Sequence, residues 1–592
     1  MMELKCSLRF REKGGMGMKR ERSVKQKRRK EGMTAHLAER KSVNILIGGE
    51  AGQGLQTAGF IFAKSLVRSG FSIHVTQTYE SRVRGGHNTF SIRVGCEKVL
   101  AAQEGIDILI ALNEETIDLH RKELTKRGLI IGDGEWKRKE KNWIGLSLKE
   151  FGEKTYWNTA CMGVAAGLIG LDEQVVAKAI EDTFGKERSE ENLKILKTSY
   201  RWLKEQALEW KKLPEIPKPA KRLVMNGNEA IALGAISAGL KFCSFYPMSP
   251  STSIAQTLID CAKDMDLIIE QAEDEIAAIN MAIGASYAGA PGIVPTSGGG
   301  FALMVEGVSL AAITETPVVI VIGQRPGPAT GLATRTEQGE LGFVLHAGHG
   351  EFPRAVFAPG TIEECFHLTR KAFELAEKYQ GPMFVLTDHF LADSYRDMEP
   401  VDVAKLSAVK AGGDPSSVKT PYLRYRMTKN GISPRLLPGL SEHLIVADSH
   451  EHTEDGHMTE NLSLRPKMVD KRLRKGDGIR SEVIPPDFQG DKKPDVLFIS
   501  WGSTKGAVEE AAVQLRSGKK KVGALHFSQV WPMVPDQFIK HLEQSKKVIC
   551  VESNATGQFA QLIRRETGFV VQKRISRYDG LSITPEYILR HL

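Results

Sequence analysis

The sequence predicts an α/β protein made of several domains with mainly parallel sheets. Short β-rich runs alternate with longer helical stretches through most of the chain, as in strand–helix–strand units. The chain has 592 residues, enough for about four domains. Hydrophobic residues make up 41% and charged residues 26%, the balance of an ordinary soluble globular protein.

The first predicted domain covers residues 42–212. A strand at 44–48 and a helix at 55–68 enclose a glycine-rich turn, and further strand-like runs follow at residues 72–76, 89–94, 108–112 and 129–132. Three prolines within six residues then predict a stiff, extended linker at 213–221.

The second predicted domain covers residues 222–393, with strands at 242–246, 267–271, 292–295, 318–322, 354–357 and 383–386 and helices between them. Residues 394–493 are polar, rich in glycine and proline and weakly periodic, so we interpret them as a partly ordered connector. The third predicted domain, 494–592, has strands at 495–500, 522–526 and 548–552.

The excess positive charge is confined to one end of the chain. Residues 1–41 hold 14 Lys/Arg and 5 Asp/Glu, and the remaining residues hold 67 of each kind. The body therefore has no cation excess for phosphates, which argues against nucleic-acid binding by the core. We interpret 1–41 as a basic, disordered extension, with Met33 as an alternative start and a nucleic-acid or surface tail as the alternative function.

Two further classes are disfavoured by composition. No apolar run approaches the roughly 18–20 residues of a membrane span, and the best candidate, 317–323, fits a buried strand. Seven scattered cysteines without a C-x-x-C pair argue against a disulfide framework, a zinc ribbon or an iron–sulfur cluster held by this chain alone. A reducing cytoplasm is the expected location.

Two loops of the first domain are candidates for anion binding. In GGEAGQG (48–54) glycines let backbone amides approach a phosphate, although the spacing is not the dinucleotide fingerprint and a tight turn explains it as well. SRVRGGHNTF (81–90) carries two arginines and a histidine, and a plain surface loop is its alternative. The possible site consists of Gly52, Gly54, Arg84, Gly85, Gly86 and His87.

The motif YPMSPSTSI (246–254) follows a strand of the second domain. Pro247 and Pro250 stiffen the turn, and Ser249 projects a hydroxyl beyond the carboxyl end of a strand, where open parallel sheets bind ligands. A helix begins here, and Ser249, Ser251 or Thr252 could cap it. Four hydroxyl residues within five positions are more than capping requires.

A third candidate is the acidic start of the helix in EDEIAAINMAIGASYAGA (273–290). Glu273 and Asp274 are explained by the helix dipole. Glu275 precedes Ile276 on a helix that should be buried, so we expect its carboxyl to be desolvated and its pKa raised, which suits proton transfer.

Two loops at later strand ends complete the candidate site. TSGGG (296–300) offers backbone amides to a ligand ring, although a turn explains it equally well. The glycine- and proline-rich loop 323–341 carries Arg325 and Arg335, and the fork of Arg335 is suited to a carboxylate.

Three motifs are interpreted as unrelated to chemistry. GDG at 132–134, with Asn158 downstream, loosely resembles the Mg²⁺–diphosphate motif of thiamine enzymes, but the highly charged stretch after it does not suit a buried helix. GDG at 476–478 and the histidine-rich 450–457 lie in the polar connector, so a solvated loop is favoured and no metal site is predicted.

Together these motifs resemble the α subunit of 2-oxoacid:ferredoxin oxidoreductases, in the form with the γ domain fused ahead of it. GEAGQGLQTAG and SRVRGGHNTF look like γ-domain signatures, and YPMSPSTSI looks like a YPITPS-type motif. The motifs beginning at 273, 296 and 314 and VESNATGQFAQLIRRETG (551–568) follow in order, so the resemblance covers residues 42–592.

The resemblance implies a γ domain, a thiamine-diphosphate pyrimidine-binding domain and a transketolase C-terminal-like domain. It implies CoA-dependent oxidative decarboxylation of a 2-oxoacid with electrons passed to ferredoxin. Thiamine diphosphate and Mg²⁺ would be shared with a β subunit that mainly anchors them. That subunit would hold the 4Fe–4S cluster, with none on this chain, in a heterodimer or dimer of heterodimers.

The resemblance also implies residue roles. Glu275 matches the glutamate that hydrogen-bonds the pyrimidine ring and drives proton removal from the thiazolium, and Thr296, Ser297 and Gly298 fall at the cofactor. Ser249 stands where the family has threonine, which keeps the hydroxyl but loses a methyl. Arg335 would clamp the substrate carboxylate, beside Tyr246 and Pro247.

The substrate has several candidates. The fused form favours 2-oxoglutarate, whose second carboxylate Arg325, Arg84 or a β-subunit residue could bind. The alternatives are pyruvate, branched-chain or aryl 2-oxoacids, and a non-catalytic scaffold. Retention of Glu275, Ser249 and Arg335 together disfavours the scaffold.

Overall fold

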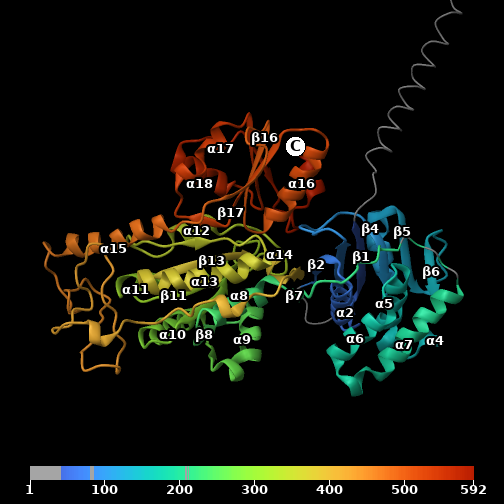
Figure 1. The fold of residues 1–592 in the computed structure, drawn as a ribbon, viewed down its shortest axis with the longest axis horizontal. Helices are drawn as coiled ribbons and strands as arrows, with labels where there is room; N and C mark the ends of the chain where they lie inside the picture. Colours follow the sequence, from blue (N-terminus) through green and yellow to red (C-terminus); the bar gives the residue numbers. More distant parts are fainter. Residues whose placement is uncertain (1–41, 81–85, 207, 209, 211) are drawn as a thin grey trace, which may run out of the picture. The chain divides into compact units, whose positions relative to one another are not determined.

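A computed structural model describes residues 42–592 apart from 81–85, 207, 209 and 211 (Figure 1). Within this described part the strands form sheets of eight, seven and five strands, and residues 44–592 form one compact unit. The basic extension 1–41, and Arg84 and Gly85 of the possible anion site, lie outside the described residues.

The eight-stranded sheet contains the first predicted domain. β1, β4, β5 and β6 run parallel, and β2 pairs antiparallel with β3. β14 joins β2 to β7, so two strands from beyond residue 212 extend this sheet. The strands are β1 (Ser42–Glu50), β2 (Ser72–Thr78), β3 (His87–Gly95), β4 (Ile106–Ala111), β5 (Leu124–Asp133), β6 (Trp143–Leu146), β7 (Leu223–Met225) and β14 (Arg396–Met398).

The helices of this region begin with α2, whose bounds coincide with the predicted helix 55–68. They are α2 (Leu55–Arg68), α3 (Glu114–His120), α4 (Leu148–Phe151), α5 (Trp157–Leu168), α6 (Glu173–Phe184) and α7 (Lys186–Glu205), with 3₁₀ turns η1 (Arg121–Glu123), η2 (Gly134–Trp136) and η3 (Lys154–Tyr156).

The seven-stranded sheet is parallel except for β18, which is antiparallel to β12. Every residue of β11 and β13 is buried, as expected for central strands covered on both faces. The strands are β8 (Phe242–Phe245), β9 (Ile268–Gln271), β10 (Gly292–Ser297), β11 (Val318–Gln324), β12 (Val356–Phe357), β13 (Pro382–Asp388) and β18 (Gln529–Trp531).

Helices follow the strands of this sheet in the alternation that the sequence predicts. Apolar residues of α10, α11 and β11 share one core with the C-terminal sheet, including Trp501 and Phe559. The helices are α8 (Gly227–Ser237), α9 (Thr252–Met265), α10 (Glu275–Tyr287), α11 (Gly298–Ile313), α12 (Leu341–His346), α13 (Ile362–Tyr379) and α14 (His389–Asp393).

The five-stranded sheet lies in the C-terminal part. β17, β16, β19 and β20 are parallel, and β15 is an antiparallel edge strand. Its elements are β15 (Asp487–Gly490), β16 (Val496–Trp501), η6 (Gly502–Thr504), α16 (Lys505–Ser517), β17 (Val522–Phe527), η7 (Pro535–Gln537), α17 (Ile539–Glu543), β19 (Lys547–Glu552), α18 (Gln558–Thr567), β20 (Lys573–Ser576) and α19 (Pro585–Arg590).

The polar stretch 394–493 contains a 17-residue helix that the sequence pattern does not reveal. Besides the 3₁₀ turns η4 (Val403–Lys405) and η5 (Pro415–Ser417), it forms α15 (Arg465–Ser481). The residues that α15 buries include Lys471, Arg472 and Lys475. Because its buried face is largely cationic, α15 lacks the apolar periodicity by which helices are recognised.

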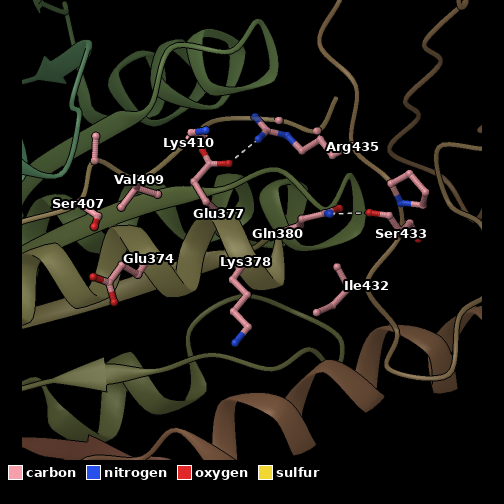
Figure 2. Close-up of a pocket in the computed structure, with 14 residues that line it drawn as sticks. Glu374, Glu377, Lys378, Gln380, Ser407, Val409, Lys410, Ile432, Ser433 and Arg435 are labelled. Carbon is pink, nitrogen blue, oxygen red and sulfur yellow. Dashed lines mark hydrogen bonds and ion pairs between the residues drawn. The ribbon is translucent and has the colours of Figure 1, made fainter. Parts of the chain in front are cut away.

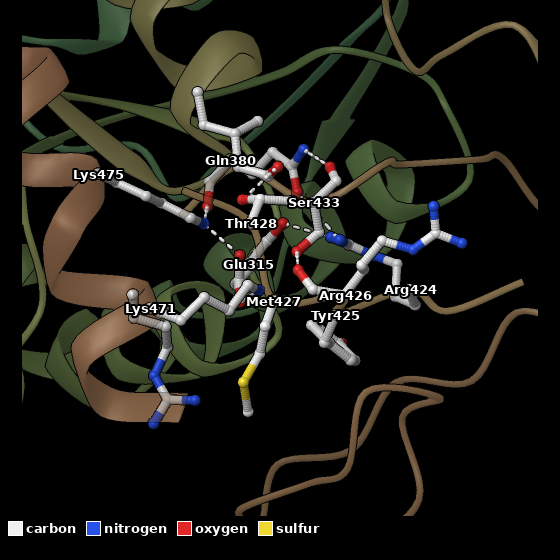
Figure 3. A network of polar contacts seen from close by, with 12 residues as sticks. Glu315, Gln380, Arg424, Tyr425, Arg426, Met427, Thr428, Ser433, Lys471 and Lys475 are labelled. Atoms are coloured by element: carbon white, nitrogen blue, oxygen red, sulfur yellow. Dashed lines mark hydrogen bonds and ion pairs between the residues drawn. The ribbon is translucent and has the colours of Figure 1, made fainter. Parts of the chain in front are cut away.

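Two of these cations, Lys471 and Lys475, pair with Glu315, which follows α11 and is fully buried (Figure 3), whereas Arg472 pairs with Glu451. Lys471 Nζ lies 2.5 Å from Glu315 Oε1, Lys475 contacts Oε2, and Arg424 donates to the Glu315 carbonyl at 2.7 Å. Burial alone would raise the pKa of Glu315, but the neighbouring cations outweigh it and lower the pKa to about 2. The carboxylate therefore fixes the connector to the second sheet.

Replacing Glu315 by glutamine should destabilise the protein strongly, because two buried ammonium groups would lose their counter-charge. The expected loss is about 3–5 kcal/mol in the free energy of unfolding, measured by thermal or denaturant unfolding. Asp402→Asn, which removes the exposed ion pair with Lys405 (2.9 Å), is the control and should have little effect. Equal unfolding midpoints for both variants would contradict this account of α15.

Candidate active site

The predicted site residues of the second domain gather at the carboxyl ends of β8, β10 and β11. β10 and β11 are in parallel register, with Ser297 beside Gly323. Ser249 follows β8, and Arg325 follows β11. This edge of the sheet is where open parallel α/β sheets bind ligands.

Glu275 is the first residue of α10 and is 4% exposed, so the expected burial is confirmed. Asp274 caps the helix by accepting from the backbone N–H of Ala277 at 2.8 Å. No hydrogen bond to the carboxyl of Glu275 is found among the described residues, and its oxygens are not among the fully buried side-chain atoms that lack a partner. A buried acid that the protein itself does not pair is available to a ligand.

The glycines of TSGGG make room for two carboxyl groups. A Cβ on Gly300 would lie 2.6 Å from Glu275 Oε1, and a Cβ on Gly298 would lie 2.5 Å from Glu340 Oε1. At Gly299 the nearest atom is a carbonyl oxygen at 3.8 Å. The first turn of α11 is therefore packed against acidic side chains at two of its three glycines.

Thr296 and Ser297 end β10 and are fully buried. The Thr296 hydroxyl is directed to the Ser297 carbonyl at 3.4 Å. The Ser297 hydroxyl is buried and lacks a hydrogen-bond partner among the described residues. Ser297 is thus a second polar group at this edge that the fold does not satisfy.

The YPMSPSTSI turn exposes the side chains of Tyr246, Pro247 and Ser249. The guanidinium of Arg325 stabilises the turn, because its Nη1 donates a hydrogen bond to the Ser249 carbonyl at 2.7 Å. Ser251 occupies the position before α9 but makes no capping bond, and its hydroxyl is directed to the Met248 carbonyl at 2.9 Å. The predicted hydroxyl cap of α9 is therefore wrong for Ser251.

The loop after β11 is held by the C-terminal domain. Gln338 is fully buried, and its backbone N–H donates to the Ser553 carbonyl at 2.7 Å. Its side chain accepts from Ser553 N–H at 2.9 Å and donates to the Trp501 carbonyl at 3.0 Å. Gln558 adds a bond to the Gly339 carbonyl at 2.6 Å. The motif VESNATGQ thus serves to position this loop.

Arg335 lies in the same loop and is half-buried. No carboxylate of the described residues lies within ion-pair distance of its guanidinium. Burial lowers the pKa of His389, and the charge of Arg335 acts in the same direction. His389 lies 3.1 Å from the hydroxyl of Tyr79, which donates to Asp393 at 2.7 Å, so the first domain reaches the neighbourhood of this loop.

In the first domain, Gly48 of the first predicted loop lies close to His87, one of the described residues of the second. Gly52 and Gly54 have φ of 92° and 67°, which requires glycine-like freedom, and Asn158 donates to the Gly54 carbonyl at 3.2 Å. A Cβ on Gly48 would lie 3.2 Å from the His87 ring. His87 Nε2 lies 2.8 Å from His120 Nε2, and burial together with His120 lowers the pKa of His87.

The motifs interpreted as unrelated to chemistry have structural roles. Asp133 of the first GDG accepts from the N–H of Glu135 at 3.1 Å at the start of η2, and the second GDG lies inside α15. His450 bonds Asp448 at 2.7 Å, and the His452 ring lies 3.8 Å from that of Tyr425. Within the described ranges no group of three His, Cys, Asp or Glu residues could hold a metal ion.

A pocket of about 550 Å³ opens elsewhere, between α13 and the connector (Figure 2). Figure 2 shows Glu377 paired with Arg435, and Gln380 bonded to the Ser433 carbonyl at 2.7 Å. None of the predicted site residues lines this pocket. It does not contribute to the candidate active site.

Glu340 and Gln338 were not predicted as site residues. Both follow Arg335 in the sequence TRTEQGEL, within the loop that the sequence singles out only for its arginines. The local signal was the presence of polar residues in a loop that leads into the apolar helix α12. Their partners, Gly298 and Ser553, are far away in the chain.

Family comparisons agree with this arrangement. Residues 44–202 match "Pyruvate ferredoxin/flavodoxin oxidoreductase", residues 233–471 match "Pyruvate flavodoxin/ferredoxin oxidoreductase, thiamine diP-bdg", and residues 494–588 match "Pyruvate:ferredoxin oxidoreductase core domain II". The three matches follow in order along the three sheets.

Individual relatives match along most of their length. The 2-oxoacid:ferredoxin oxidoreductase subunit alpha of Sulfolobus sp is 31% identical over 90% of this chain and 94% of its own. The 2-oxoglutarate oxidoreductase subunit KorA of Mycobacterium tuberculosis is 28% identical over 93% of this chain and 91% of its own. A solved structure is also similar: the 2-oxoglutarate:ferredoxin oxidoreductase of Magnetococcus marinus with 2-oxoglutarate, coenzyme A and succinyl-CoA bound. It superposes with a TM-score of 0.88 at 30% identity, and the match covers 93% of this chain and 99% of that chain.

The fold and the family matches define an oxidoreductase subunit with a thiamine-diphosphate-binding domain. The chain belongs to the α subunits of 2-oxoacid:ferredoxin oxidoreductases, as the order of its motifs predicts. The predicted α/β class with three mostly parallel sheets is confirmed. Among the described residues, none of the helices has the length and apolar composition of a membrane span.

The glycine run offers a matched test of the site. Gly300→Ala should displace the Thr296 hydroxyl and the Glu275 carboxyl, because the new Cβ would lie 2.4 Å from Thr296 Oγ1 and 2.6 Å from Glu275 Oε1, and kcat of the reconstituted enzyme should fall about tenfold or more. Gly299→Ala, in the same turn but meeting only a carbonyl oxygen at 3.8 Å, should stay near the wild-type rate. Oxoacid-dependent reduction of a viologen dye measures both. Similar rates for the two variants would contradict the geometry.

Proposed function

We propose that the chain is the fused γα subunit of a 2-oxoglutarate:ferredoxin oxidoreductase. The proposed reaction joins 2-oxoglutarate and CoA, releases CO₂ and succinyl-CoA, and passes two electrons to ferredoxin. The observation that carries the proposal is the buried Glu275 carboxyl, packed against Gly300 at a ligand-binding sheet edge and unpaired within the described chain. Residues 42–212 act as the γ domain, 222–393 as the pyrimidine-binding domain, and 494–592 as the transketolase C-terminal-like domain.

The residues at this edge fit the ring-binding half of thiamine diphosphate. Glu275, Thr296, Ser297 and Gly298 would hold it, because the buried Ser297 hydroxyl needs a polar partner and the Glu275 side chain beside it is only 4% exposed. When bound, the cofactor supplies carbanion stabilisation for decarboxylation. The role of Glu275 is to hold a proton at its carboxyl and present it to the ring. Mg²⁺ and the diphosphate are assigned mainly to the β subunit.

The exposed turn and the loop after β11 would bind the substrate. Arg335 lacks a carboxylate partner among the described residues, so its guanidinium is available for the oxoacid carboxylate. Ser249 would donate a hydrogen bond, and Tyr246 and Pro247 would form the wall of the pocket. The Mycobacterium tuberculosis and Magnetococcus marinus relatives are named for 2-oxoglutarate, which favours it over pyruvate.

The β subunit, with the 4Fe–4S cluster, would dock on the helices that carry the site. Ile276 and Met281 of α10 and Leu303 of α11 are 51%, 38% and 52% exposed. Large apolar side chains exposed next to a buried catalytic acid are typical of a surface that a partner covers. The expected assembly is a heterodimer or a dimer of heterodimers.

The first domain is assigned a further anion- or partner-binding site. Gly52, Gly54, Gly86 and His87 belong to the adjoining loops, and Arg84 and Gly85 complete the proposed set. CoA and ferredoxin are the co-substrates of the proposed reaction. The Magnetococcus marinus enzyme is described with coenzyme A bound. A cytoplasmic location stays a prediction.

Reconstitution with a β subunit of the same family tests the proposal. The complex is assayed for CoA-dependent viologen reduction with 2-oxoglutarate, pyruvate, branched-chain and aryl 2-oxoacids. The highest kcat/KM is expected with 2-oxoglutarate. A preference for another oxoacid would correct the substrate, and no turnover with any oxoacid would favour a scaffold subunit.

Glu275→Gln should abolish turnover, because the amide cannot exchange a proton with the cofactor ring. The complex should still assemble, since the substitution keeps the size of the side chain. Assembly is checked by co-purification of the β subunit, and turnover by dye reduction. Rates within a few-fold of wild type would remove the assigned role.

Arg335→Ala should mainly raise KM for the oxoacid, because the lost guanidinium binds the substrate carboxylate. A charge-assisted bidentate pair is worth about 1.5–3 kcal/mol, so KM should rise roughly 10- to 150-fold. The KM for CoA serves as the internal control and should change much less. Steady-state kinetics on the complex would contradict the assignment if both constants rose equally.

A further inference from the structure

The short helix α14 (His389–Asp393) connects the loop after β11 to the first domain. Most of its residues are buried, and its N-cap residue Asp388 is 1% exposed. A helix of five residues leaves most of its backbone N–H and carbonyl groups unpaired, so it needs partners from other segments. These partners come from both of the parts that it connects.

Thr336 fixes the loop after β11 to the start of α14. Its hydroxyl accepts from the backbone N–H of Phe390 at 3.2 Å and donates to Asp388 Oδ1 at 3.3 Å. Thr336 is 7% exposed, and its own N–H donates to the Gly580 carbonyl at 3.2 Å. Arg335 directly precedes Thr336 in the chain, so these bonds also fix the backbone of Arg335.

Tyr79 of the first domain binds α14 from the other side. Its hydroxyl donates to Asp393 Oδ2 at 2.7 Å, and His389 Nε2 lies 3.1 Å from the same hydroxyl oxygen. Burial and the neighbouring Asp393 both raise the pKa of Tyr79, so the hydroxyl keeps its proton and remains a donor. Gln77 adds a bond from Nε2 to the Asp393 carbonyl at 3.3 Å. The end of β2 therefore holds both ends of α14.

The segment around α14 also follows the first sheet closely. The Phe390 ring stacks on His74 of β2 with centroids 5.5 Å apart, and the N–H of Val75 donates to the Tyr395 carbonyl at 2.8 Å. Arg396 of β14 then pairs with His74 in antiparallel register. Because tightly packed elements move as units, a displacement of α14 relative to β2 would also displace the loop that Thr336 fixes to it.

We propose that Tyr79 is a positioning residue of the oxoacid site, which acts through α14 and Thr336 on the position of Arg335. The first domain then contributes to oxoacid binding without a contact to the substrate. The inference rests on the proposed function in one respect, the role of Arg335 as the ligand of the oxoacid carboxylate.

A purely stabilising role of Tyr79 predicts a different outcome. Loss of a structural hydrogen bond lowers the free energy of unfolding, but it leaves the kinetic constants of the folded molecules unchanged. A positioning role instead raises KM for the oxoacid and leaves KM for CoA nearly unchanged, because only the geometry at Arg335 is disturbed. The two roles are therefore separated by kinetics and not by stability.

The main test is Tyr79→Phe, which removes the hydroxyl and keeps the ring, in the reconstituted complex. KM for the preferred oxoacid, measured by dye reduction, should rise about three- to tenfold, the range of couplings between residues that act through one another. In an Arg335→Ala background the same substitution should have little further effect, because the group that it positions is absent. An equal rise with and without Arg335 would overturn the inference.

Two further variants provide the control and the second end of the connection. Tyr200→Phe removes a hydroxyl that donates to the Leu171 carbonyl at 3.1 Å, within the first domain and without a contact to α14, and should leave KM unchanged. Thr336→Val keeps the size of the side chain, removes its bonds to α14 and should raise KM. With Tyr79→Phe the combined increase should be smaller than the product of the separate ones, because both act through α14. A full product would overturn the connection.

Amide hydrogen exchange separates this inference from the proposed function, because it needs no turnover. The N–H groups of Thr336 and Gln338 are bonded to the Gly580 and Ser553 carbonyls and report on the order of the loop. Their exchange should be faster in Tyr79→Phe than in wild type and in Tyr200→Phe. Unchanged exchange in Tyr79→Phe would overturn the inference alone. Faster exchange without turnover on any oxoacid would refute the proposed function and still support the action of Tyr79 on the loop.

Discussion

The arrangement of the site depends on one buried glutamine. Both backbone and side-chain polar groups of Gln338 are bonded to the C-terminal domain, at Ser553, Asn554 and Trp501. Each bond is modest by itself, but an unsatisfied group at a fully buried position is costly, so the contacts form together. Arg335 and Glu340 flank Gln338 within five residues, and their positions follow from it.

The same region combines rigidity with polar groups that the chain leaves unpaired. Glycines 298 and 300 let the acids Glu340 and Glu275 approach the start of α11, and the apolar core shared by the second and third sheets keeps this turn in place. Apolar side chains of α10 and α11 are exposed nearby. This chain holds the polar groups of the site in place, and the exposed apolar side chains beside them are free to be covered. Such a site is suited to completion by a second subunit.

Charge, rather than apolar packing, attaches the long connector. Glu315 binds Lys471 and Lys475, and the buried pair of Glu377 and Arg435 joins the connector to α13. Buried ion pairs contribute little net stability but are costly to break on one side, so they define a unique docking position. The connector also supplies β14, which pairs with β2 and β7, so it is attached to the first sheet as well as to the second.

The sequence by itself determined the strands and helices with apolar periodicity, the bounds of α2, the order of the motifs and the burial of Glu275, because these depend on local patterns of side chains. Only the tertiary structure decided the helix α15, the addition of β7 and β14 to the first sheet, the absence of a side-chain cap at Ser251, and the positions of Gln338 and Glu340. The physical reason is that α15, the added strands and Gln338 depend on partners more than a hundred residues away, Glu340 on a close approach at glycine, and Ser251 on a choice between two local hydrogen bonds. Such contacts leave no periodic signal in the chain.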